Sequence, residues 1–173
     1  MNIVRCQKLG TKLGNVFMLL CLLVTNSGSV QVAQAAAGDT IRVSVSSSGA
    51  QGNNSSGLYG GAGDVSVSIS ADGHYVAFLS DASNLVSGDT NGYGDIFVRD
   101  TVANTTTRVS VDSNEAEGNC WSAWPSISAD GRYVAFVSCA SNLVSGDTNG
   151  YEDVFVRDTV MNTTKLVSVD SSS

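Results

Sequence analysis

The chain has 173 residues, with 16 acidic and nine basic side chains and a formal net charge of −7. This acidic balance disfavours nucleic acid as a partner, because phosphate groups would be repelled, and it is compatible with divalent cations. The length suits one small domain. The whole sequence contains a single histidine and neither a G-x-S-x-G nor an H-E-x-x-H motif, so we expect no enzyme.

Residues 1–35 have the pattern of a secretory signal peptide. A basic leader precedes an apolar core of nine residues at 16–24, and a small-x-small cleavage signal follows at 33–35. Nine apolar residues are too few to span a bilayer, although a retained membrane anchor is the alternative. We therefore expect an exported protein, periplasmic or extracellular, that is not an integral membrane protein after cleavage.

A leading segment at 36–63 separates this signal from the first repeat. Within it, Ile41–Val45 matches the later sequence Val109–Val111, which is predicted to end a strand. We expect this piece to be a closing strand that completes a neighbour's sheet or the chain's own last sheet. Residues 46–63 are rich in Gly, Ser and Asn, which predicts a flexible loop.

The rest of the chain consists of two closely similar units, at 64–112 and 113–173. Residues 70–106 recur as 128–164, with 31 of 37 positions identical. In each unit, short runs rich in Val, Ile, Phe, Tyr and Thr alternate with clusters of Gly, Asp, Asn and Ser, which is typical of β-strands. The predicted strands are 65–70, 75–80, 95–100 and 106–111, and then 123–128, 133–138, 153–158 and 164–169.

The strands at 75–80 and 95–100 are apolar at consecutive positions, which indicates burial on both faces of the sheet. Four-stranded antiparallel sheets that are covered on both faces are the blades of a β-propeller. We therefore predict an all-β fold with two such blades. Because known propellers have about four to eight blades, two blades indicate a partial propeller or one completed by oligomerisation.

The sequence S-A-D-G-R-Y-V-A-F-V-S at 128–138, followed by D-V-F-V-R-D at 153–158, resembles the repeat of TolB-like, WD-type β-propellers. The resemblance implies an extracytoplasmic, non-catalytic protein-interaction module with a protein or cell-envelope partner. Two alternatives stay open. One is a carbohydrate-binding, lectin-like propeller built by oligomerisation, for example as a trimer, and the other is the N-terminal fragment of a propeller-bearing hydrolase.

An oxygen-rich loop occurs once in each unit and suggests calcium, the one cofactor that the sequence indicates. The residues are Asp89, Asn91 and Asp95 in the first unit, and Asp147, Asn149 and Asp153 in the second. Their spacing resembles the first half of a calcium loop. It is also similar to the loops of integrin-type propellers, but two residues shorter and without the middle Asp. The alternative is a structural loop whose carboxylates accept backbone amides.

Two cysteines follow the predicted signal peptide. Counting outwards from the turn at 129–131, Cys120 comes one step from Cys139, so a disulfide between them is reachable. The same positions in the first unit align with Ala62 and Asp81, so the bridge would be a local staple.

Trp121 and Trp124 stand at the entry to the second unit, where the first unit aligns with Gly63 and Ser66. Paired aromatic side chains near a surface can stack on a sugar or on a protein partner. The alternative is that one of them belongs to the core.

Overall fold

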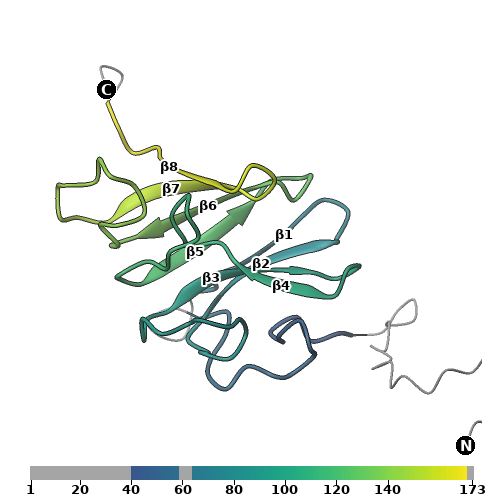
Figure 1. Ribbon diagram of the computed structural model, residues 1–173. Coiled ribbons are helices and arrows are strands. Elements are labelled where there is room, and N and C mark those ends of the chain that lie inside the picture. Colours follow the sequence, from purple (N-terminus) through teal and green to yellow (C-terminus); the bar gives the residue numbers. More distant parts are fainter. Residues whose placement is uncertain (1–39, 59–63, 171–173) are drawn as a thin grey trace, which may run out of the picture. The chain divides into compact units, whose positions relative to one another are not determined.

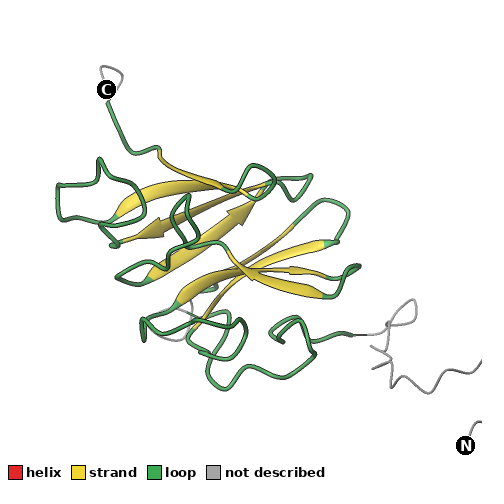
Figure 2. Ribbon diagram, viewed as in Figure 1, coloured by secondary structure: helices red, strands yellow, loops and turns green. Residues whose placement is uncertain are grey.

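The structure is a computed structural model, and it describes residues 40–58 and 64–170. The predicted signal peptide at 1–35 lies outside these residues. Every helix or strand element in the described ranges is a β-strand, which agrees with the predicted all-β class (Figure 2). Within the same ranges, no helix is long and apolar enough to cross a membrane.

The strands form two four-stranded antiparallel sheets, and in each sheet strands that are consecutive in sequence are neighbours (Figure 1). The first sheet, blade 1, contains β1 (Val67–Ile69), β2 (Tyr75–Ser80), β3 (Asp95–Asp100) and β4 (Thr105–Arg108). The second sheet, blade 2, contains β5 (Ser122–Ile127), β6 (Tyr133–Ser138), β7 (Asp153–Asp158) and β8 (Thr163–Leu166). Two such meanders packed face to face are blades of the propeller type, as predicted.

The hairpins that join the first two strands of each blade are formed by the Ser-Ala-Asp-Gly sequence. In blade 1, Ser70 Oγ donates to Asp72 Oδ1 at 2.6 Å, and the same carboxylate oxygen accepts the His74 N–H at 3.0 Å. Gly73 has φ 74°, in the left-handed region that glycine favours. These turns fix the start of the second strand, so β2 and β6 have the bounds predicted from the sequence.

The fourth strands are shorter than predicted, because at their ends serine hydroxyl groups replace backbone carbonyls as hydrogen-bond acceptors for the third strands. β4 ends at Arg108 and β8 at Leu166, whereas strands to 111 and 169 were expected. In blade 1 the Ile96 N–H donates to Ser110 Oγ at 3.0 Å, so a hydroxyl group occupies the place of a backbone carbonyl. In blade 2 the Val154 N–H donates to Ser168 Oγ at 3.1 Å.

The largest apolar core lies between the two blades. The Phe136 and Phe155 face of blade 2 packs with a face of blade 1 that carries Leu79 and Ile96, and all four side chains are at most 2% exposed. On the other face of blade 1, Phe78 forms a second cluster with Ala82, Leu85 and Phe97. Blade 1 is therefore buried on both faces of β2 and β3, whereas Val67 and Ile69 of β1 are 46% and 61% exposed.

The leading segment does not complete the chain's own last sheet, and its pairing with a neighbour's sheet stays a prediction. Ile41 is 47% exposed, and Val45 makes only an isolated bridge to Gln51. The fourth strand of blade 2 is the chain's own β8. Instead, the segment covers blade 1: a Cβ at Gly52 would lie 3.2 Å from Ala82 Cβ and within 3.5 Å of the Leu85 side chain.

Eight additional residues of blade 1 interrupt its first strand. Gly57 N donates to Leu79 O, and Leu79 N donates to Ser66 O, so Gly57 and Ser66 lie opposite the same residue. In blade 2 the same place has a β-bulge between Ala123 and Ser126. Because of this insertion, residues before it in blade 1 align with residues 66 rather than 58 positions later in blade 2. The blade 1 counterparts of Cys120 and Trp121 are therefore residues 54 and 55, and not Ala62 and Gly63.

Candidate functional site

In blade 1 the acidic loop surrounds the guanidinium group of Arg108. Arg108 Nη1 lies 3.4 Å from Asp89 Oδ1, 3.1 Å from Asp95 Oδ2 and 2.8 Å from Glu117 Oε2. Arg108 Nη2 donates to the Gly88 carbonyl oxygen at 3.1 Å. The side chains of Arg108, Asp89 and Asp95 are at most 9% exposed. Within blade 1, an arginine therefore supplies a positive charge at the loop for which calcium or a purely structural role was expected.

The carboxylates around Arg108 differ in how readily they ionise. Burial raises the pKa of Asp89, and the neighbouring Asp95 carboxylate raises it further. Burial also raises the pKa of Asp95. Desolvation alone would raise the pKa of Glu117, but hydrogen bonds from Thr90 and Arg108 lower it to about 2. Glu117 is therefore firmly ionised at neutral pH and is a matched partner for Arg108.

In blade 2 the same loop has no arginine, because Leu166 stands at the position of Arg108. Asp147 and Asp153 are 7% and 5% exposed. Asp153 is well satisfied, since it accepts from Asn149 Nδ2 and from Ser168 Oγ. In contrast, Asp147 Oδ2 is buried without a hydrogen-bond partner within the described residues. Burial and the Asp153 carboxylate raise the pKa of Asp147.

The structure thus distinguishes the two predicted calcium loops, which are nearly identical in sequence. Asn91 and Asn149 play a structural role in both, because each donates to the carboxylate of Asp95 or Asp153. Across residues 40–58 and 64–170, no three His, Cys, Asp or Glu side chains are placed to hold a metal ion. In blade 2 any cation would have to bind two carboxylates together with carbonyl or water oxygens.

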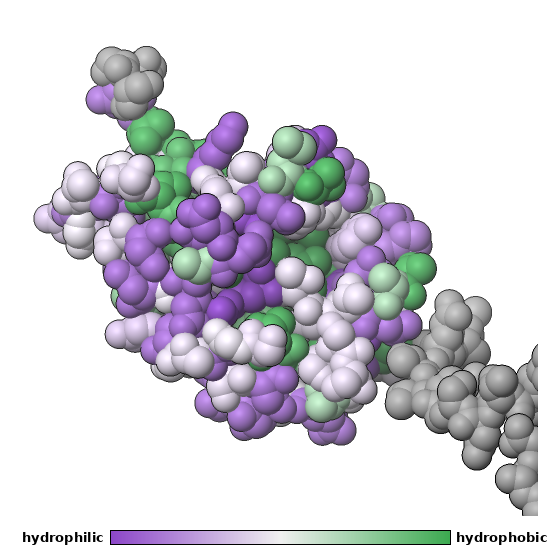
Figure 3. Space-filling view, viewed as in Figure 1, coloured by the Kyte–Doolittle hydropathy of each residue, from purple (hydrophilic) through white to green (hydrophobic). Residues whose placement is uncertain are grey.

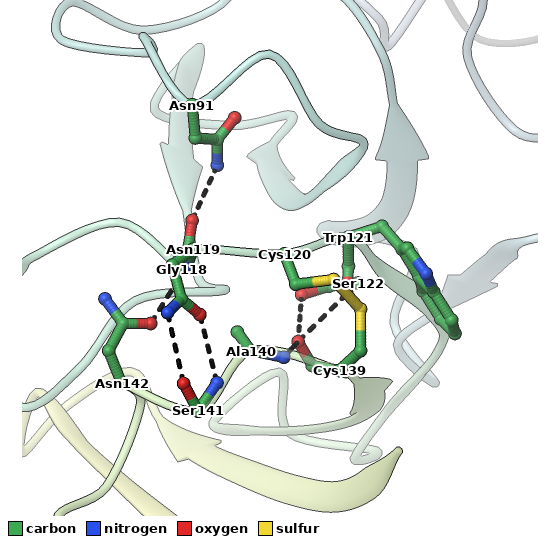
Figure 4. Close-up of a disulfide and its surroundings, with 11 residues drawn as sticks. Asn91, Gly118, Asn119, Cys120, Trp121, Ser122, Cys139, Ala140, Ser141 and Asn142 are labelled. Atoms are coloured by element: carbon green, nitrogen blue, oxygen red, sulfur yellow. Dashed lines mark hydrogen bonds between the residues drawn. A yellow bond between two sulfur atoms is a disulfide. The ribbon is translucent and has the colours of Figure 1, made fainter. Parts of the chain in front are cut away.

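Cys120 and Cys139 form a disulfide at the entry to blade 2 (Figure 4). Beside it, Asn119 Nδ2 donates to Ser141 Oγ at 3.1 Å, and the Ser141 N–H donates to Asn119 Oδ1 at 3.0 Å. Blade 1 makes the same pair of hydrogen bonds between Asn53 and Ser83, without any disulfide. The disulfide is therefore an addition to a junction that side-chain hydrogen bonds already form.

The two tryptophans contact each other edge to face, with ring centroids 5.9 Å apart and an interplanar angle of 88°. Trp121 is half-buried, whereas Trp124 is 43% exposed. Trp124 has φ 53°, in the left-handed region, and its backbone N–H donates to Ser66 Oγ of blade 1 at 2.9 Å. The bulge of β5 thereby presents one indole ring at the surface while its backbone is anchored to the neighbouring blade.

In both blades, an arginine and a threonine hydrogen-bond to the segment that leads into the blade. In blade 2, Arg157 Nη1 donates to Asp112 O at 2.9 Å, and Thr164 Oγ1 donates to Val111 O at 2.5 Å. In blade 1, Arg99 Nη1 donates to the carbonyl oxygen of residue 46 at 3.2 Å. These roles, and that of Arg108, were not predicted from the sequence. For Arg99 and Arg157 the signal was an arginine that follows the apolar centre of the same strand in both units.

The outer face of blade 2 exposes apolar side chains, as does β1 of blade 1, where Val67 and Ile69 are 46% and 61% exposed. Side chains alternate between the two faces along a strand. Phe136 and Phe155 face blade 1, so the residues next to them in sequence, such as Val154, lie on the outer face. Val154 and Val167 are 38% and 46% exposed, whereas their blade 1 counterparts Ile96 and Val109 are 0% and 2% exposed. Figure 3 shows apolar side chains gathered next to the C-terminal segment.

These features define the chain as an all-β protein built from β-propeller-type blades. No family model and no curated protein matches it. Among solved structures, it is similar to TolB from Acinetobacter baumannii, with 20% identity and a TM-score of 0.38 over 62% of this chain and 21% of that chain. It is also similar to a putative TolB from Agrobacterium tumefaciens, with 14% identity and a TM-score of 0.40 over 63% of this chain and 32% of that chain. The chain spans about a third or less of the length of either structure.

Proposed function

We propose that the chain is an exported, non-catalytic protein-interaction module that binds another propeller-type blade through the outer face of blade 2. The observation that carries the proposal is the difference in burial between corresponding residues of the two blades. Blade 2 covers one face of blade 1. The equivalent face of blade 2 has an almost identical sequence but is exposed to solvent. Export is proposed from the signal-peptide pattern at 1–35.

The partner that fits this face best is a second copy of the same chain. Blade 2 binds blade 1 through Phe136 and Phe155, and blade 1 carries the corresponding Phe78 and Phe97 on the equivalent face. A head-to-tail contact between copies would therefore repeat the contact that already exists within the chain. Three copies would give six blades, a number within the known range for closed propellers.

Head-to-tail docking requires one local rearrangement. Residues 41–45, which lead into blade 1, correspond to 107–111, which lead into blade 2. The receiving copy already has its own equivalent of this segment, 165–169, at the end of blade 2. Residues 41–45 of the incoming copy and 165–169 of the receiving copy would therefore compete for the same position beside blade 2. β8 is hydrogen-bonded into blade 2, whereas 41–44 belong to no strand. The leading segment is therefore the one expected to move.

Light scattering coupled to size-exclusion chromatography tests this proposal on the exported protein. We expect a discrete trimer for the natural chain and a monomer for Val154→Asp, because a buried carboxylate without a partner opposes docking. Val160→Asp is the matched control, since Val160 is 67% exposed in the turn between β7 and β8. A natural chain that stays monomeric at every concentration tested would overturn the proposal.

Carbohydrate binding is a second candidate, favoured by the exposed Trp124 ring beside Trp121. Aromatic rings at a surface can stack on the apolar face of a sugar. A glycan array with the natural protein and with Trp124→Ala tests it. Binding that is lost in the variant supports the lectin function, and the absence of any bound glycan excludes it.

A further inference from the structure

We propose that blade 2 binds one divalent cation of the calcium type between Asp147 and Asp153, at the position where blade 1 holds the guanidinium group of Arg108. The two loops have the same length and almost the same sequence. A positive charge, that of Arg108, lies beside the blade 1 loop, whereas Leu166 stands at the same position beside the blade 2 loop. The blade 1 loop therefore shows where a cation can lie relative to these carboxylates.

The reference site shows which oxygen atoms converge on a cation. In blade 1, the Gly88 carbonyl and the carboxylates of Asp89 and Asp95 all lie within 3.4 Å of a guanidinium nitrogen. The two carboxylates have the counterparts Asp147 and Asp153 in blade 2. Gly88 has φ 78°, whereas Gly146 does not have a positive φ, so the Gly146 carbonyl is not counted among the ligands. The fourth group, Glu117, comes from the connector that leads from blade 1 into blade 2 and is not part of the repeated loop.

The blade 2 loop lacks the compensation that two buried carboxylates need. Leu166 replaces the arginine, and Asp147 Oδ2 is buried without a hydrogen-bond partner in the described part of the chain. Burying a carboxylate without a counter-charge or a hydrogen bond is costly. A bound cation would satisfy this oxygen and would also balance the negative charge of Asp153.

The donor set determines which cation is expected. All the candidate ligands are oxygen atoms, which hard cations prefer over zinc or copper. Calcium accepts irregular sites with six to eight oxygens and several waters, whereas magnesium requires near-ideal octahedral geometry. With only two carboxylates, we expect a weak site with a dissociation constant of about 10⁻⁴–10⁻³ M, as in extracellular modules.

Isothermal titration with CaCl₂, together with thermal unfolding in EDTA and in calcium, tests the inference. For the natural protein we expect one bound ion and a higher Tm in calcium than in EDTA. Leu166→Arg copies blade 1 and should supply the missing charge, so we expect no calcium binding and a Tm in EDTA above that of the natural protein. The reciprocal variant Arg108→Leu should bind a second ion.

A matched pair of carboxamide variants serves as a control. Asp147→Asn should abolish the calcium response, whereas Asp89→Asn, at the same position of blade 1, should retain it. An absence of heat and of any Tm change up to about 10 mM calcium would overturn the inference, since that exceeds the weakest affinity expected. Equal shifts from calcium and from NaCl of the same ionic strength would also overturn it, because they would show charge screening only.

Discussion

One residue of the fourth strand, arginine at 108 in blade 1 and leucine at 166 in blade 2, decides whether a positive charge lies beside the buried carboxylates of the loop. In blade 1 the guanidinium group contacts three acidic side chains, although Arg108 Nε itself is buried without a hydrogen-bond partner among the described residues. In blade 2 the same carboxylates are buried beside an apolar side chain, and one oxygen has no partner among the described residues. The chemistry of the loop thus depends on a residue of the fourth strand, outside the loop itself.

A second difference at the residue scale predicts a pH effect. Arg132, which replaces His74 of blade 1, donates to both oxygens of Asp158, and these hydrogen bonds hold the pKa of Asp158 below its ordinary value of 3.8. The stability from this pair is complete above that value and is lost as the pH falls through the folded-state pKa. In Arg132→His we expect the Asp158 pKa, measured by carbon NMR, to rise towards its ordinary value.

The control for this titration is Asp130 in the same molecule. Its pKa is lowered mainly by the hydrogen bond from Ser128 Oγ, which the substitution does not remove. The Asp130 pKa should therefore stay low in Arg132→His. If Asp158 titrates at the same pH in both proteins, Arg132 is not the cause of the shift.

At the scale of elements, the segments that lead into the blades hold the blades in place. Each one is bound by an arginine from the third strand and a threonine from the fourth, and each carries a glycine, Gly52 or Gly118, that packs on an alanine of the blade. The segment before blade 2 is further linked by the disulfide. Entry into blade 2 is therefore covalently fixed, while entry into blade 1 depends on hydrogen bonds.

The disulfide should contribute measurably to stability. It closes a loop with a sequence separation of 19 residues, and removing such a bridge is expected to cost about 2–4 kcal/mol of unfolding free energy. Urea denaturation of Cys120→Ser/Cys139→Ser against the natural protein measures the loss. The matched variant Ser83→Ala, which removes one side-chain partner of Asn53 in blade 1, should cost less, about 1 kcal/mol. Equal unfolding midpoints for the natural and the cysteine-free protein would contradict the prediction.

At the scale of the whole molecule, neither blade has enough partners by itself. Blade 2 and the leading segment cover the two faces of blade 1 at β2 and β3 but leave β1 exposed, and blade 2 is buried on one face. The burial of each residue is therefore a property of its place in the array and not of the unit's own sequence. Repeat proteins in general obtain their stability from such contacts between neighbouring units.

This dependence predicts the behaviour of a shortened chain. A protein ending at Asp112 retains all four strands of blade 1, but it would expose Ala77, Leu79 and Ile96 to solvent. We expect it to lack a cooperative thermal transition by circular dichroism, whereas the natural chain unfolds cooperatively. A cooperative transition in the shortened protein would show that one blade is sufficient for folding.

The sequence by itself determined the local structure of this protein. The Ser-Ala-Asp-Gly turns and the apolar runs between them set the bounds of β2, β3, β6 and β7, because turn residues and strand propensity act over a few neighbouring positions. The repeat likewise predicted two equal sheets. The ends of β4 and β8 were not predictable, since they depend on serine hydroxyls that replace backbone carbonyls across the sheet.

Only the tertiary structure decided which of two matching residues is buried and which loop is neutralised. Ile96 and Val154 occupy matching positions in nearly identical local sequences, yet a neighbouring blade covers the first and leaves the second exposed. Asp89 and Asp147 are likewise equivalent in sequence, but the strand beside each contributes an arginine in one case and a leucine in the other. Burial and charge balance depend on groups far apart along the chain, and only folding brings these groups together.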